Sequence, residues 1–238
     1  MTVGFQRMAE GSVLYRAGST VVLCTASVDA KLPAWLEGKG KGWITAEYQM
    51  HPRSNPERRE SRDGRGKAPS GRTQEIQRLI GRALRAGVDL VKLSERQIAI
   101  DCDVLEADGG TRTASITGGF VALAIALAKL HKEGKLTEPV IREPVAATSV
   151  GYIGDDLALD LVYVEDSKAE VDLNLVATRS GAIIEVQGTA EGAPVPEKDI
   201  LRMMRMGLVG VEQLTHVQEK VLAGAGIDLK LLLIGAES

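Results

Sequence analysis

The chain has 238 residues, 44% of them hydrophobic and 26% charged, and its 29 basic and 32 acidic side chains give a formal net charge of −3. This balance is typical of a single globular domain and excludes collagen-like, low-complexity and disordered classes. The longest unbroken apolar run, 120–128, has about half the length of a membrane span, and no basic segment followed by an apolar run opens the chain, so we expect a cytoplasmic protein without membrane contact.

The N-terminal part of the chain has the pattern of β-strands. Val13–Tyr15 and Val21–Ser27 are β-rich runs joined by Ala-Gly-Ser, which predicts a hairpin, and Trp43–Tyr48 continues the β character. Cys24 and Cys102 each stand in an apolar, β-rich stretch without a C-x-x-C partner. We therefore interpret both as buried free thiols.

A basic window follows, from Arg53 to Arg72, with seven basic and three acidic side chains. It holds several prolines and glycines and no aliphatic residue larger than alanine, so it predicts a long, mobile, basic surface loop. Arginines in such a loop suit a polyanion such as RNA, because phosphate contacts give affinity that does not depend on sequence. A solvated charged loop without a ligand is the alternative.

The remainder alternates between helical and β patterns. Apolar residues at helical spacing predict amphipathic or buried helices over 73–88, 113–131 and 197–223, the last with Ile200, Leu201, Met204, Leu208, Val211 and Leu214 as its apolar series. Strands are expected over 97–105, 146–152, 158–164, 171–178 and 183–187. Strands paired in local hairpins, with helices gathered separately, indicate an α+β fold.

A glycine turn brings an arginine and a threonine to the start of the second helix. In Gly110-Thr111-Arg112, free backbone N–H groups, the positive end of the helix dipole and a guanidinium converge, which suits a phosphate. Arg72 stands in the same way just before the first helix. The alternative for the turn is an ordinary helix cap.

Two carboxylates flank a predicted turn in the second half. Asp166 ends one β run and Asp172 begins the next, so a tight turn between them would bring both side chains to the same end of a hairpin. Such a pair suits Mg²⁺, or a carboxyl group with a raised pKa that acts as a general acid. A solvated turn is the alternative.

Other chemistries find no support in the sequence. His51, His131 and His216 have no Ser, Cys or metal-ligand companions at suitable spacing, which argues against a nucleophilic triad and a zinc site. A Walker-type G-x-x-x-x-G-K-[ST] loop does not occur.

Six blocks of the sequence resemble, in order, those of the bacterial ribonuclease PH family. They are GSVLYRAGSTVVLCTASV, GWITAEYQMHPRS, SGRTQEIQRLIGRALRAGVDL, IDCDVLEADGGTRTASITGGFVALA, YVEDSKAEVDLNLV and IIEVQGTAEG, spanning about 11–192. The resemblance implies the ribonuclease PH fold, which is like domain 2 of ribosomal protein S5, with two related β-α units in one domain over 1–238. The family's opening Arg-x-Asp-Gly-Arg motif does not occur in the chain.

The resemblance also implies an activity and a set of site residues. The activity is phosphate-dependent 3′→5′ trimming of tRNA precursors and other RNA 3′ ends, reversible, with release of nucleoside diphosphates, by a hexameric ring of three dimers. Orthophosphate, as co-substrate, would bind Arg72, Gly110, Thr111 and Arg112. Asp166 and Asp172 would hold Mg²⁺, and one of them would supply a proton. The RNA would meet Arg53, Arg58, Arg59 and Arg62.

Two alternatives remain open from the sequence. The chain would be a non-catalytic RNA-binding subunit of an exosome-like ring if the fold persisted without activity, or a metal-dependent hydrolytic nuclease if the carboxylates activated water. The sequence also leaves open the choice between Mg²⁺ and Mn²⁺ and the identity of the proton donor.

Overall fold

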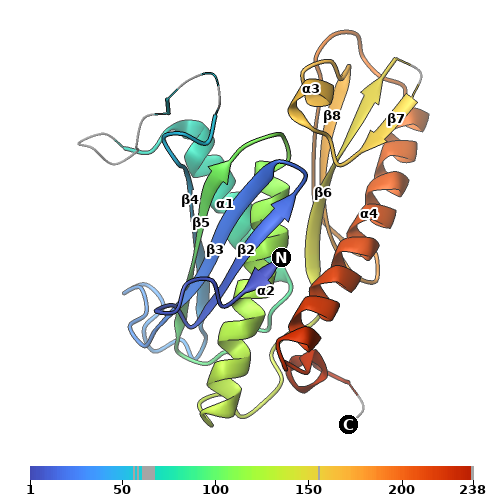
Figure 1. Ribbon diagram of the computed structural model, residues 1–238. Helices are drawn as coiled ribbons and strands as arrows, with labels where there is room; N and C mark the ends of the chain where they lie inside the picture. Colours follow the sequence, from blue (N-terminus) through green and yellow to red (C-terminus); the bar gives the residue numbers. More distant parts are fainter. Residues whose placement is uncertain (56, 58, 61–67, 155, 237–238) are drawn as a thin grey trace.

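The computed structural model describes residues 1–55, 57, 59–60, 68–154 and 156–236. This part of the chain forms two β-sheets, with one long helix between them and another along the outer side of the second sheet (Figure 1). The predicted α+β class is therefore confirmed.

The first sheet contains the predicted N-terminal hairpin. Its strands, in spatial order, are β1 (Thr2–Val3), β2 (Gly11–Ala17), β3 (Thr20–Asp29), β5 (Gln97–Glu106) and β4 (Trp43–Met50). All neighbours are antiparallel except β4 and β5, which are parallel. Cys24 and Cys102 face each other across β3 and β5 and are buried free thiols, as predicted.

The second sheet is antiparallel throughout. Its order is β7 (Asp156–Leu159), β6 (Val145–Ile153), β8 (Val171–Thr178) and β9 (Ile183–Ala190). The three strands predicted over 146–152, 171–178 and 183–187 are confirmed to within a few residues. β9 forms the edge of the sheet on the side away from β7.

Helix α2 (Thr111–Lys132) forms the centre of the molecule, because it packs on both β3 and β6. It is long and apolar enough to span a membrane, yet 83% of its most apolar window is buried inside the protein. A helix that is hydrophobic on all sides is expected in such a position. Phe120 accordingly shares one core with Val22 of the first sheet and Ala147 of the second.

The other helices cover the outer parts of this arrangement. Helix α1 (Gly71–Ala86) packs on β4, α4 (Glu197–Gly224) packs on β6 and β8, and a short 3₁₀ helix, Leu229–Leu232, follows α4. Helix α3 (Tyr163–Asp166) is a single turn before β8. The predicted ends of α1, α2 and α4 agree with the structure within two residues.

The apolar series predicted for α4 is confirmed for five of its six members. Val211 is buried, and four more are partly buried and pack against the core at the second sheet: Ile200, Met204, Leu208 and Leu214. Leu201 is wrong, because it is 44% exposed. The helix also turns Met203 and Gly207 toward the sheet. A Cβ on Gly207 would lie 2.8 Å from a methyl group of Leu175, so the glycine lets the helix backbone approach the sheet closely. A pattern search that counts only large apolar residues misses this contact.

The strand predicted over 158–164 is also wrong beyond its start. Strand β7 ends at Leu159, because Asp160 takes the left-handed conformation, with a φ of 60°. The chain then enters α3, where the backbone N–H of Tyr163 donates to Asp108 Oδ1 at 3.2 Å. Asp166 therefore ends a helical turn and not a β run, and the predicted hairpin between Asp166 and Asp172 does not form.

The basic window differs from the prediction at both of its ends. Its last residues belong to α1, which begins at Gly71. Near its start Ser54 is only 3% exposed, and its carbonyl oxygen accepts a hydrogen bond from the N–H of Ala107. The window therefore begins attached to the end of β5. Residues 56, 58 and 61–67 of the window lie outside the described residues.

Candidate active site

A polar cleft of about 1070 Å³ lies where the starts of α1 and α2 meet α3 and the second sheet. Four of the predicted site residues line it: Arg72, Arg112, Asp166 and Asp172. Two of these come from helix starts in the first half of the chain and two from the second half. The structure thus brings together residues separated by up to a hundred positions in the sequence.

The start of α1 presents Arg72 to this cleft. Ser70 caps the helix, since its side chain accepts a hydrogen bond from the N–H of Thr73 at 3.1 Å. The first turn contains no acidic residue, so no carboxylate there neutralises the positive end of the helix dipole. Arg72 is exposed and lies in this turn. Both its charge and the free N–H groups favour an anion.

The start of α2 is shaped by two glycines with left-handed backbone. Gly109 has a φ of 79°, and a Cβ there would lie 2.3 Å from the carbonyl oxygen of Leu161. Only glycine therefore allows the segment before α3 to lie against this turn. The hydroxyl of Thr20 fixes the turn further, since it donates to the carbonyl oxygen of Gly109 at 2.7 Å and accepts from the N–H of Asp108. Gly110, with a φ of 57°, is the N-cap.

The same turn joins the two halves of the site. Asp108 accepts the hydrogen bond from the first N–H of α3, as described above, and α3 carries Asp166 at its end. The Asp-Gly-Gly sequence therefore both opens the anion-binding end of α2 and holds the acidic helical turn beside it.

Thr111 and Arg112, the first two residues of α2, have partners on different strands. The hydroxyl of Thr111 lies 2.9 Å from the hydroxyl of Tyr48 on β4, and Arg112 Nη1 donates to Gln187 Oε1 on β9 at 3.3 Å. Burial raises the pKa of Tyr48, and the positive charges of Arg72 and Arg112 act against that rise. Both guanidinium groups therefore lie close enough to influence the Tyr48 hydroxyl. Thr111 and Gly110 are at the helix start but do not line the cleft itself.

Asp172, on β8, is the more buried member of the acidic pair. Burial raises its pKa and the nearby charge of Asp166 adds to the rise, while Arg112 and a hydrogen bond from Asn174 Nδ2 oppose it. Asp172 Oδ1 is buried and has no hydrogen-bond partner within the described residues. An orphaned carboxylate oxygen beside a second carboxylate fits a bound cation.

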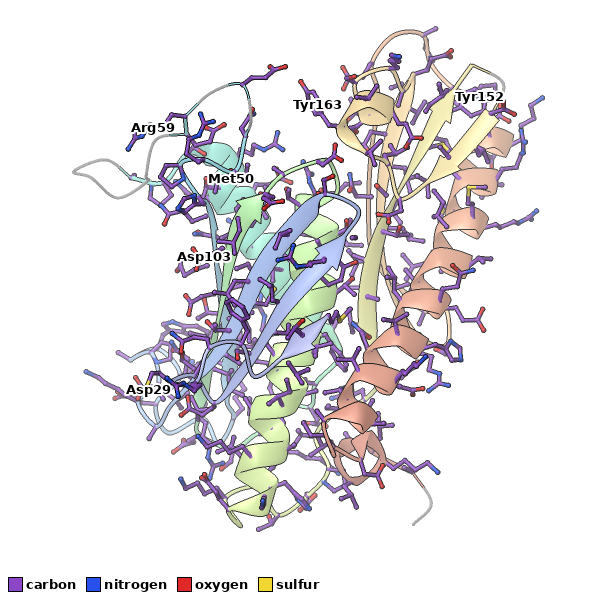
Figure 2. All side chains as sticks on the ribbon, in the orientation of Figure 1. Asp29, Met50, Arg59, Asp103, Tyr152 and Tyr163 are labelled. Atoms are coloured by element: carbon purple, nitrogen blue, oxygen red, sulfur yellow. The ribbon has the colours of Figure 1, made fainter. Side chains whose placement is uncertain are left out.

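The two predicted RNA-binding arginines that the structure describes, Arg53 and Arg59, do not line the cleft. Arg53 and Arg59 are exposed and follow β4, whereas Arg58 and Arg62 fall outside the described residues. Figure 2 shows Arg59 and Met50, the last residue of β4, at the same end of the molecule as Tyr163 of α3. Arg59 is therefore at the same end of the molecule as α3, whose Asp166 lines the cleft.

Two site residues have no counterpart in the sequence analysis. Tyr48 and Gln187 stand in strands, where the sequence gives only alternation and β character. The sequence could have pointed to each of them only as a polar side chain inside one of the blocks that resemble the ribonuclease PH family. Their partners, Thr111 and Arg112, become visible only when the strands are placed.

Comparison with known proteins decides the family. The family model described as "3' exoribonuclease family, domain 1" matches residues 1–129, and the one described as domain 2 matches residues 143–210. A protein of Rhodopirellula baltica named Ribonuclease PH is 52% identical over 222 residues, covering 91% of this chain and 89% of that protein.

The chain belongs to the ribonuclease PH family. A second Ribonuclease PH, from Exiguobacterium sibiricum, is 55% identical over 217 residues and covers 91% of this chain and 86% of that protein. The family match extends beyond the interval of 11–192 expected from the sequence blocks.

Solved structures of low identity share the fold of this ribonuclease PH family member. An Archaeoglobus fulgidus exosome with RNA bound to the active site aligns with a TM-score of 0.72 and 18% identity, covering 91% of this chain and 86% of that one. An archaeal exosome core aligns with a TM-score of 0.67 and 17% identity, covering 92% and 84%. At this identity the likeness shows the fold alone, and it confirms the predicted ribonuclease PH fold.

Proposed function

We propose that the protein is a phosphate-dependent 3′→5′ exoribonuclease that trims tRNA precursors and releases nucleoside diphosphates. The single observation that carries the proposal is that Arg72 and Arg112 line one cleft together with Asp166 and Asp172. Two arginines at acid-free helix starts suit a phosphate as the attacking group. Water as a nucleophile would need no such cationic site, which favours phosphorolysis over hydrolysis.

Orthophosphate would be oriented by Arg72 and Arg112, which line the cleft. Gly110 and Thr111 stand directly before Arg112 at the start of α2, so their N–H groups and the Thr111 hydroxyl would act from the edge of the cleft. One of the orthophosphate oxygens attacks the phosphorus of the last nucleotide, and the bond from that phosphorus to the 3′ oxygen of the preceding nucleotide breaks. The products are a nucleoside diphosphate and an RNA shorter by one residue. Because no enzyme nucleophile takes part, the residues act by positioning and by neutralising charge on the transferring phosphoryl group.

Asp166 and Asp172 are the residues that would hold Mg²⁺. The orphaned Asp172 Oδ1 supports this assignment, and Mn²⁺ would suit the same oxygen ligands. When bound, the ion would supply positive charge beside the phosphoryl oxygens. The leaving 3′ oxygen takes its proton from one of the two aspartates. Because a carboxylate that ligates a metal ion is ionised, the donor would be protonated in a state in which the other aspartate alone holds the ion.

A product assay tests the reaction. A tRNA with a short 3′ trailer is incubated with the protein and Mg²⁺, with and without orthophosphate. We expect nucleoside diphosphates only when phosphate is present, and resynthesis of the trailer when diphosphates are added in excess. Monophosphates formed equally without phosphate would make the protein a hydrolase, and bound but uncleaved RNA would make it a non-catalytic subunit.

The first part of the basic window, from Arg53 to Arg62 and here called the basic segment, is proposed to hold the RNA through Arg53, Arg58, Arg59 and Arg62. Replacing Arg58, Arg59 and Arg62 together with glutamine is expected to weaken tRNA binding and to reduce the slope of log affinity against log salt by about two, at roughly 0.7 per lost contact with single-stranded RNA. Binding is measured by fluorescence anisotropy at several salt concentrations.

The control for this measurement removes the same number of charges from the exposed face of α4, at Lys198, Arg205 and Lys220. Its salt slope should stay closer to that of the wild type. A triple variant of the basic segment with an unchanged slope would remove that segment from the RNA path. We also propose that the protein forms a hexameric ring of three dimers and is located in the cytoplasm.

A further inference from the structure

Gln187 occupies a position between the positive and the negative side chains around the cleft. It lies on β9 directly opposite Asn174 of β8, and paired residues of antiparallel strands point to the same face of a sheet. Its Oε1 accepts from Arg112 Nη1 at 3.3 Å, and its Nε2 donates to Glu75 at 3.1 Å and to Glu185 at 3.0 Å. The side chain is partly buried. One amide therefore contacts residues of α1, α2 and β9 at once.

The partners fix the orientation of this amide. A guanidinium only donates hydrogen bonds and an ionised carboxylate only accepts them. The observed orientation satisfies all three contacts, whereas a flipped amide would set its NH₂ group against Arg112 and its oxygen against Glu75 and Glu185. Glu185 is itself held in place, since it receives two hydrogen bonds from Arg82 of α1, at 2.7 and 3.1 Å.

A neutral amide at this position has an electrostatic consequence. Arg112, Glu75 and Glu185 all bond the same amide, Arg112 at its oxygen and the two glutamates at its nitrogen, so the Gln187 side chain stands between the guanidinium and the two carboxylates. A direct ion pair with either carboxylate would neutralise the guanidinium and hold it away from a phosphate. Gln187 gives both carboxylates a different donor and gives Arg112 an uncharged acceptor. The guanidinium is thereby oriented, and neither Glu75 nor Glu185 forms an ion pair with it that would compete with a phosphate.

We infer that Gln187 is a positioning residue that orients Arg112 toward orthophosphate and keeps it from pairing with Glu75 and Glu185. This role rests on the proposed function, because it concerns the phosphate co-substrate. Gln187 acts through Arg112 and does not itself touch the reacting atoms. Its loss should therefore alter the use of phosphate more than the use of RNA.

Two substitutions separate orientation from charge. Gln187→Leu removes the hydrogen bonds while keeping similar bulk, and we expect the KM for phosphate to rise about tenfold, the loss typical of one hydrogen bond to a charged group. Gln187→Glu adds a carboxylate beside Arg112, and we expect a further rise, to about a hundredfold, because that charge competes with phosphate. The KM for RNA at saturating phosphate should change little in both variants.

The measurement varies phosphate at saturating RNA and RNA at saturating phosphate, with Mg²⁺ present, and adds calorimetric titration with inorganic phosphate alone. Gln213→Glu, which places the same charge on the exposed face of α4, is the matched control and should behave as the wild type. Thermal unfolding establishes that each variant folds.

The outcomes distinguish the two proposals. A wild type that forms no diphosphates would overturn the proposed function. A wild type that forms them, with both variants folded and at the wild-type KM and dissociation constant for phosphate, would overturn the role of Gln187 alone. Equal losses toward phosphate and RNA would also overturn it, because they would indicate a merely structural part for this side chain.

Discussion

Replacing Arg112 with alanine is expected to abolish most phosphate-dependent turnover while RNA binding survives. Arg112 lines the cleft beside Arg72, and its guanidinium is held by Gln187 at the acid-free start of α2. Removing one preorganised charge from a site that stabilises a transferring phosphoryl group costs about 10²–10³-fold in kcat. We expect a loss of at least this size in the rate of diphosphate release, measured with phosphate near saturation.

RNA binding in the same variant is the second readout. Because the RNA contacts are proposed to come from the basic segment after β4, and its described arginines Arg53 and Arg59 do not line the cleft, the affinity for a tRNA precursor without orthophosphate should stay within a few-fold of the wild type. Arg205→Ala, on the exposed face of α4, removes the same charge far from the cleft and should leave both readouts unchanged. Equal loss of turnover and RNA affinity in the Arg112 variant would contradict the assignment of Arg112 to phosphate.

The parts of the site that the sequence predicted share a local signal. Gly110, Thr111 and Arg112 are adjacent in the chain, and a glycine turn before an apolar run predicts a helix start. This prediction does not depend on where the helix packs in the fold. Arg72 carries the same signal at α1. Both helices begin within two residues of the predicted positions, because caps and apolar periodicity are properties of neighbouring residues.

The parts that the sequence missed depend on strands meeting across the molecule. Gln187 reaches Arg112 over 75 positions of sequence, and Tyr48 reaches Thr111 over 63. Asp166 shows a different limit: β propensity around Val164 predicted a strand, yet the left-handed Asp160 and the cap from Asp108 produce a helical turn. The carboxylates still share one cleft, although the hairpin invoked to bring them together is absent.

Asp172→Asn is expected to remove activity and to stabilise the metal-free fold. The substitution keeps the shape of the side chain but removes a charge from the cleft, and we expect turnover to fall by about 10²-fold or more, as for other losses of charge stabilisation. In wild-type protein kept in EDTA, burial and the charge of Asp166 raise the pKa of Asp172. Ionising this carboxyl group therefore costs more free energy in the folded state than in the unfolded chain.

The pH dependence of stability follows from the direction of this shift. Between the ordinary pKa of an aspartate and the raised pKa, the folded state binds more protons than the unfolded state, so stability falls as pH rises. Below the ordinary value both states are protonated and this loss is absent. The amide that Asp172→Asn introduces does not titrate. The variant in EDTA should therefore melt at a higher temperature than the wild type near neutral pH, and the difference should vanish as the pH falls below the ordinary aspartate range.

If Asp172 holds the ion, adding Mg²⁺ should reverse the order of the two melting temperatures, so that the wild type melts above the Asp172 variant. A ligand that binds only the folded state raises the melting temperature, so Mg²⁺ should stabilise the wild type and leave the Asp172 variant nearly unchanged. Asp156→Asn, at the exposed start of β7, removes the same charge outside the cleft and should respond to Mg²⁺ as the wild type does. Equal stabilisation of wild type and the Asp172 variant by Mg²⁺ would place the ion elsewhere. A variant no more stable than the wild type in EDTA would show that burial of this carboxylate costs the metal-free fold nothing, which would contradict the raised pKa of Asp172.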